Sequence, residues 1–242
     1  MMYPESFQFQ KNFEINSFFV NPKGSLRIKG LADLLQEIAW KHADSQDFGR
    51  NLSKANQMWV LARLELKLFQ MPKWGQKVEL FTGGRGVDKI FAFREFLMRD
   101  LDGNVLVRGM SSWLLLDSNS KKMLRPEMVL PVELFDPALK PEWQPGKIIK
   151  NGELIKEETI KVKASDLDLY DHVNNTSYVR WVEDLIYDMV PHVKQFSINY
   201  LSECLLGDEV TLQLFKDENA FFVMGFVEGK TSFSVEVSLE SL

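Results

Sequence analysis

The chain has 242 residues, of which 45% are hydrophobic and 26% are charged, and its formal charge at pH 7 is −5. This composition is typical of a folded globular protein and excludes a disordered chain. The one cysteine, Cys204, excludes a disulfide scaffold and suits the reducing cytoplasm, where we place the protein. The negative charge argues against nucleic-acid binding, and no apolar run approaches the roughly 20 residues of a membrane span.

The first half of the chain predicts a strand, a helix and then an antiparallel meander. Residues 7–19 are rich in Phe and Ile and predict a strand, and the helix is predicted by an apolar face made of Leu31, Leu34, Leu35, Ile38 and Ala39. Further strands are predicted over residues 59–69, 74–80, 91–99 and 105–116. The last two flank Asp102-Gly103, a strong hairpin dipeptide. Residues 83–86, Gly-Gly-Arg-Gly, lack the spacing of a phosphate-binding loop and predict a flexible loop.

A proline-rich stretch separates the two halves. Five of the nine prolines lie between residues 126 and 145. Because proline fixes φ and removes a backbone donor, no long regular element is expected there. We therefore predict an N-terminal domain over residues 1–125, a linker over 126–150 and a C-terminal domain over 151–242.

The second half repeats the order of the first. It predicts strands over residues 159–163, 196–200, 206–212, 221–227 and 231–239. A helix follows the first of these, with an apolar stripe of Tyr178, Trp181, Val182, Leu185, Ile186 and Met189. The strand starts at Gly75 and Gly207 are 132 residues apart. The pattern predicts an α+β fold in two duplicated domains, and the alternative is two unrelated α+β domains.

One loop in the second half carries residues suited to catalysis. Residues 174–177 offer N-caps for the predicted helix, so His172 precedes unpaired backbone N–H groups and the positive end of the helix dipole. With Asp168 four residues upstream, this is a plausible general-base and oxyanion arrangement. The alternative is a loop with solvated acids whose histidine caps a turn. The three histidines are scattered and no Cys or His pair has zinc spacing, so we predict neither a metal nor a cofactor.

Two segments of the second half carry a recognisable motif: Ser-Asp-Leu-Asp-x-x-x-His-Val-Asn-Asn-x-x-Tyr at residues 165–178 and Tyr-Leu-Ser-Glu-Cys at 200–204. They resemble segments of the acyl-acyl carrier protein (acyl-ACP) thioesterases. Residues 35–39, 59–63 and 72–75 are similar to family segments in the first half. The resemblance implies two tandem hotdog domains, each a long helix wrapped by an antiparallel sheet. It also implies hydrolysis of a fatty acyl-ACP thioester, which releases free fatty acid and ends chain elongation, with acyl carrier protein as the partner.

The resemblance also assigns the catalytic residues. Asp168, His172 and Glu203 match the catalytic carboxylates and histidine of the family. Tyr170 stands where the family usually has Asn, which puts the oxyanion role of that position in doubt. We favour water activated by Asp168 or Glu203, and the alternative is Cys204 as a nucleophile activated by His172. In a regular strand only one of Glu203 and Cys204 could face the site, and Cys204 could equally be a small buried hydrophobe.

The remaining predictions concern the substrate. Asn174 and Asn175 are expected to cap and shape the loop beside the substrate. The resemblance implies that the acyl chain lies against Leu31, Leu34, Leu35, Ile38, Met58 and Trp59, although these side chains could simply fill the core. Residues 22–28 lack the Asp, His and Asn pair of the second half, which predicts one active site per chain.

An acidic carrier protein would need a basic surface on this enzyme. The candidate cations form two sets, Lys121, Lys122 and Arg125 or Lys23, Arg27 and Lys29. The alternative functions are an acyl-CoA thioesterase and a catalytically weak acyl-binding hotdog protein, and the fold also allows a homodimer.

Overall fold

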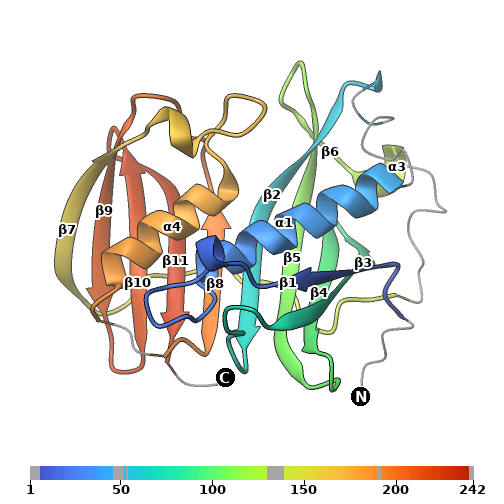
Figure 1. Cartoon of the computed structure of the whole chain (residues 1–242). Coiled ribbons are helices and arrows are strands. Elements are labelled where there is room, and N and C mark those ends of the chain that lie inside the picture. Colours follow the sequence, from blue (N-terminus) through green and yellow to red (C-terminus); the bar gives the residue numbers. More distant parts are fainter. Residues whose placement is uncertain (1–5, 46–51, 53, 130–138, 190–191, 240–242) are drawn as a thin grey trace. The chain divides into compact units, whose positions relative to one another are not determined.

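The computed structural model describes residues 6–45, 52, 54–129, 139–189 and 192–239. The chain divides into two compact units (Figure 1). Unit 1 comprises Met1–Leu64 and Phe69–Pro145, and unit 2 comprises Glu65–Leu68 and Gly146–Leu242. Within the described residues, no helix is both long enough and apolar enough to cross a membrane.

Unit 1 is an antiparallel sheet with one long helix on it. Its elements are β1 (Phe9–Glu14), the 3-10 turn η2 (Ser17–Phe19), α1 (Ile28–Ser45), β2 (Gln57–Leu68), β3 (Lys77–Asp88), β4 (Phe91–Asp100), β5 (Val105–Asp117), β6 (Met123–Leu124) and α3 (Pro126–Val129). The strand order is β1-β3-β4-β5-β2, and β6 pairs with β5. Helix α1 packs on β1 and β3.

Unit 2 has the same topology. Its elements are β7 (Glu153–Lys161), the 3-10 turn η4 (Ala164–Asp166), α4 (Asn175–Ile186), β8 (Gln195–Tyr200), β9 (Glu209–Lys216), β10 (Ala220–Val227) and β11 (Lys230–Ser238). The strand order is β7-β9-β10-β11-β8. In both units the first strand, β1 or β7, pairs with the first strand of the meander, β3 or β9. The strand that follows the helix, β2 or β8, pairs with the last strand of the meander, β5 or β11. Each unit therefore has the predicted helix-on-sheet arrangement, in duplicate.

The buried faces of the two helices form the cores. On α1 the residues predicted to face the core, Leu31, Leu34, Leu35 and Ile38, are all buried. On α4 the rings of Tyr178 and Trp181 pack on Phe233 of β11, with centroids 5.1 and 6.4 Å away. Gly225 in β10 makes room for this, since a Cβ there would lie 2.0 Å from the Phe233 ring. The predicted stripe was one turn too long, because α4 ends at Ile186 and Met189 is partly exposed.

The prediction of a flexible loop at residues 83–86 was wrong. Gly83 and Gly84 lie in β3 and pair with β4, and a bulge separates Gly84 from Val87. A Cβ on Gly83 would lie 2.2 Å from the Gln8 side-chain oxygen, which accepts the Gly84 N–H at 2.7 Å. The glycines therefore allow close approach of another segment within a strand, as glycines in strands often do.

Part of the predicted linker is ordered against unit 1. Residues 130–138 of this linker lie outside the described residues, and its first residues form α3. Arg63 in β2 donates to the Pro145 carbonyl at 2.9 Å, and the Arg108 guanidinium lies 4.8 Å from the centre of the Trp143 ring. The domain limits at 125 and 151 stay predictions.

Candidate active site

Residues 167–173 form a closed loop between η4 and α4. Leu167 and Val173 pair as an isolated antiparallel bridge, and the Asp168 N–H donates to the His172 carbonyl at 2.8 Å. The Asp168 carboxylate stabilises the turn, because its Oδ1 accepts the N–H groups of Tyr170 at 2.8 Å and His172 at 3.3 Å. Asp168 therefore shapes the loop that presents His172.

The buried residue Asp166 anchors the base of this loop. Its carboxylate accepts the Lys163 N–H at 2.8 Å and forms an ion pair with Arg180 of α4. Its carbonyl accepts the Asn174 N–H at 2.8 Å and the Ser177 hydroxyl at 3.0 Å. Both ends of the loop are thus fixed to the first turns of α4. The sequence prediction did not include Asp166 or Arg180. A signal was present, because Ser177 and Arg180 lie three residues apart on one helix face and can both reach an acid just before the helix.

Two asparagines begin α4. Asn174 is the N-cap, and its Oδ1 accepts the N–H and the hydroxyl of Thr176 at 3.0 and 3.1 Å. The carbonyl of Asn175 accepts the Tyr200 hydroxyl at 3.0 Å. Asn174 therefore caps the helix. Contact of either asparagine with substrate stays a prediction.

His172 faces Glu203, which lies on the segment that follows β8. His172 Nδ1 and Glu203 Oε1 are 3.9 Å apart, and their side chains are 32% and 53% exposed. This distance is longer than a direct hydrogen bond, so the pair is close but not locked together. An accessible carboxylate beside an accessible imidazole can take and hold protons. Tyr170, on the same loop as His172, has 64% of its side chain exposed.

Cys204 points away from this pair. Strand β8 ends at Tyr200, so the regular strand considered for residues 203 and 204 is absent from this described segment. Cys204 is nevertheless fully buried, and its N–H donates to the Tyr178 hydroxyl at 3.0 Å. Burial raises the pKa of the Cys204 thiol. Since the thiolate is the nucleophilic form, this environment disfavours attack by Cys204.

The predicted site residues fall into two groups. Asp168, Tyr170, His172, Asn174 and Glu203 lie together in unit 2, on the two segments just described. The predicted acyl-chain residues belong to unit 1: four lie on the buried face of α1, while Met58 and Trp59 lie in β2. Trp59 packs with Leu124 against the buried Leu52 and Leu115. Their contact with an acyl chain stays a prediction.

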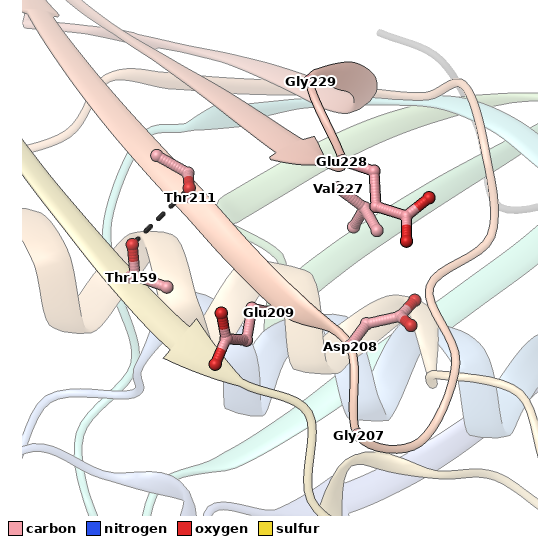
Figure 2. Close-up of a pocket in the computed structure, with 8 residues that line it drawn as sticks. All are labelled: Thr159, Gly207, Asp208, Glu209, Thr211, Val227, Glu228 and Gly229. Atoms are coloured by element: carbon pink, nitrogen blue, oxygen red, sulfur yellow. Dashed lines mark hydrogen bonds between the residues drawn. The ribbon is translucent and has the colours of Figure 1, made fainter.

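A separate pocket of about 460 Å³ opens on unit 2 (Figure 2). Its lining residues are Thr159, Gly207, Asp208, Glu209, Thr211, Val227, Glu228 and Gly229. Three carboxylates border it, and none of the predicted site residues is in its lining. Asp208 also accepts the Leu205 N–H at 2.8 Å, next to the segment that carries Glu203. The pocket is thus an acidic hollow, distinct from the candidate site in its lining residues.

Comparison with protein families covers both units. Residues 6–130 match the model of the acyl-ACP thioesterase N-terminal domain, and residues 149–237 match that of the C-terminal domain. The chain belongs to the acyl-ACP thioesterase family. The resemblance seen in the sequence is therefore confirmed, and the His172 loop and Glu203 lie in the part that matches the C-terminal domain.

Curated plant proteins are among the relatives of this acyl-ACP thioesterase family member. It is 23% identical over 228 residues to oleoyl-acyl carrier protein thioesterase 1, chloroplastic, of Arabidopsis thaliana, covering 85% of this chain and 63% of that protein. It is 29% identical over 223 residues to dodecanoyl-[acyl-carrier-protein] hydrolase, chloroplastic, of Cinnamomum camphora, covering 84% and 58%. The chain therefore spans less than two thirds of these relatives.

Solved structures confirm the fold. An acyl-ACP thioesterase from Bacteroides thetaiotaomicron superposes with a TM-score of 0.82 at 26% identity, covering 98% of this chain and 99% of that one. The 12:0-ACP thioesterase from Umbellularia californica gives a TM-score of 0.81 at 24% identity, covering 95% and 96%. The chain thus has the α+β fold of two tandem hotdog domains.

Proposed function

We propose that this chain hydrolyses the thioester of fatty acyl-ACP and releases free fatty acid. The observation that carries the proposal is the approach of His172 Nδ1 to Glu203 Oε1, 3.9 Å apart, in the part of the chain that matches the family's C-terminal domain. The loop that presents His172 is tied down at its base by Asp166 and internally by Asp168. Such support keeps reacting groups in place.

The proposed mechanism uses water. Glu203 accepts a proton from a water molecule, whose oxygen attacks the carbonyl carbon of the thioester. His172 and the positive end of α4 stabilise the negative charge that develops on the carbonyl oxygen. The carbon–sulfur bond then breaks, and the leaving sulfur takes the proton that Glu203 holds, so that the carrier leaves as its thiol and Glu203 returns to the carboxylate. Asp168 supplies a second negative charge on the loop that carries His172.

The choice between water and Cys204 can be tested directly. The buried thiol, whose pKa is raised by burial, supports water as the nucleophile. We expect Cys204→Ala to keep most of the turnover, because a small apolar side chain can replace a buried thiol. Near-complete loss of kcat in a folded Cys204→Ala protein would instead establish Cys204 as the nucleophile.

The substrate class is tested with purified protein and matched acyl chains on acyl carrier protein and on coenzyme A, with the release of free thiol measured. Turnover of the carrier-bound thioester, strongly reduced but still measurable in Glu203→Gln, is the expected result. Preferred turnover of the coenzyme A thioester would favour the acyl-CoA thioesterase. An acyl ligand that binds but is not cleaved would favour the acyl-binding protein.

The proposal extends to the location and to the partner. The presence of a single cysteine, the buried Cys204, supports a reducing compartment such as the cytoplasm. Lys121, Lys122 and Arg125 are exposed and can face an acidic carrier protein, whereas Lys29 is already paired with Asp33 at 2.7 Å. We therefore favour the set at residues 121–125 for carrier contact. Measurement of the mass in solution tests whether the protein forms a homodimer.

A further inference from the structure

The segment that carries Glu203 has little regular structure to hold it. It follows the end of β8, and the N–H groups of Leu201 and Ser202 both donate to the Ser232 carbonyl, at 2.8 and 3.0 Å. These bonds fix the chain before Glu203. After Glu203, the next residue is held by a side chain of α4, because the Cys204 N–H donates to the Tyr178 hydroxyl at 3.0 Å.

Tyr178 is itself rigidly packed. Its ring meets those of Tyr200 and Phe233 edge to face, with centroids 5.5 and 5.1 Å away, and lies 4.9 Å from the Trp181 ring. Burial raises the pKa of the Tyr178 phenol, which keeps the hydroxyl protonated. A phenol held in this way presents its oxygen at a constant position to the Cys204 N–H.

We propose that Tyr178 is a positioning residue, whose hydroxyl holds the Glu203 segment to α4 and so sets the distance between Glu203 and His172. The same helix begins with the residues that anchor the His172 loop, so one hydroxyl joins the two segments that form the pair. Without it, the buried Cys204 N–H would lose its partner and the chain after Glu203 would shift. This role rests on the proposed function, since it acts through Glu203.

Tyr200 offers a matched control. Its hydroxyl also joins β8 to α4, but it donates to the Asn175 carbonyl at 3.0 Å, in the first turn of the helix. Burial raises the pKa of Tyr200 as well. Tyr178→Phe and Tyr200→Phe each remove one buried hydroxyl and keep the ring, so we expect both to lower the Tm by a similar amount, about 3 °C.

The activity test compares these variants on acyl-ACP. We expect Tyr178→Phe to lower kcat about 10-fold with KM unchanged, and Tyr200→Phe to change kcat less than about 2-fold. Adding Tyr178→Phe to Glu203→Gln should cause no further loss, because the hydroxyl acts through Glu203. Equal losses of kcat in the two Phe variants, or an additive loss in the double variant, would overturn the proposal.

A second measurement does not depend on turnover. The NMR signals of the His172 ring should move in the same direction in Tyr178→Phe as in Glu203→Gln, and stay in place in Tyr200→Phe. A wild-type chain that cleaves no thioester would reject the proposed function, and this comparison would still decide the role of Tyr178. Unchanged His172 signals in Tyr178→Phe would show that the hydroxyl is only structural.

Discussion

Residues 20–26 before α1 and residues 167–173 before α4 form the same closed loop. In each, the first and last residues pair as an isolated antiparallel bridge. The second residue, Asn21 or Asp168, donates its N–H at 2.8 Å to the carbonyl four residues later. Its side-chain Oδ1 accepts two backbone N–H groups of the loop. The two units thus share this backbone, and the differences lie in the side chains.

The side chains that differ show which features the loop needs in order to fold and which it does not. Ser25 takes the place of His172, and its hydroxyl accepts a hydrogen bond from Lys73, whereas His172 faces Glu203. Asn21 shows that a neutral side-chain acceptor is enough to close this loop. The charge of Asp168 and the imidazole of His172 are therefore not needed for the fold, which leaves them available for catalysis.

The largest effect is expected from making the second loop resemble the first. We expect His172→Ser to lower kcat/KM on acyl-ACP by about 10³-fold, because the imidazole that stabilises the developing oxyanion is lost. The Tm should stay near that of wild type, since Ser25 occupies the equivalent loop position. Ser25→Ala is the control and should leave turnover unchanged. Substantial turnover by His172→Ser would place the chemistry elsewhere.

Asp168→Asn gives the second loop the residue that the first loop has at the equivalent position, Asn21. Asn21 closes the equivalent loop, so the variant should fold with a Tm within about 2 °C of wild type. We expect kcat to fall by about 10²-fold, because the loop that carries His172 loses a carboxylate that can act as a general base. The thermal melt and the steady-state rates are measured on the same sample. Full activity would mean that Asp168 only shapes the loop.

The stability of unit 1 should depend on pH through His42 on α1. His42 is 7% exposed, and Arg94 Nη1 lies 2.9 Å from its Nδ1. Burial and, secondly, the charge of Arg94 lower the pKa of His42 to about 4. The unfolded chain, with an ordinary histidine pKa of about 6.5, therefore binds the proton first as pH falls. The contribution of neutral His42 to the free energy of unfolding is fully present above about pH 6.5 and is lost as the pH falls towards 4.

Thermal melts at pH 7.5 and pH 5 test this expectation. Wild type should lose more Tm between the two values than His42→Gln, whose amide oxygen can still accept from Arg94 but does not titrate. Equal losses in the two proteins would show that other groups govern the acid sensitivity.

The smallest effect is expected at Tyr170, which lies in the middle of the loop that carries His172. Tyr170→Asn should leave stability nearly unchanged, because the side chain is mostly exposed. We expect a rise in kcat of about 3-fold, since a carboxamide can hold the thioester oxygen with less bulk. A fall in kcat, measured on the same acyl-ACP, would assign a useful role to the phenol. Binding without hydrolysis before and after the change would favour the acyl-binding alternative.

The sequence alone determined the features that depend on neighbours along the chain. Helical spacing identified the buried face of α1, the Asp102-Gly103 dipeptide placed the β4–β5 hairpin, and the Asn-rich run located the start of α4. The recurrence of these local patterns also predicted two similar units. Each depends on backbone preferences and periodicity within a few residues, which a single sequence records.

Only the tertiary structure decided the contacts between distant segments. Gly83 pairs with β4 within β3 while Gln8 approaches it closely, and the buried Asp166 forms an ion pair with Arg180. The irregular chain after β8, held by Ser232 and Tyr178, turns Glu203 towards His172 and buries Cys204. No local pattern records such partners, because hydrogen bonds and close packing between distant residues form only when the chain brings them together.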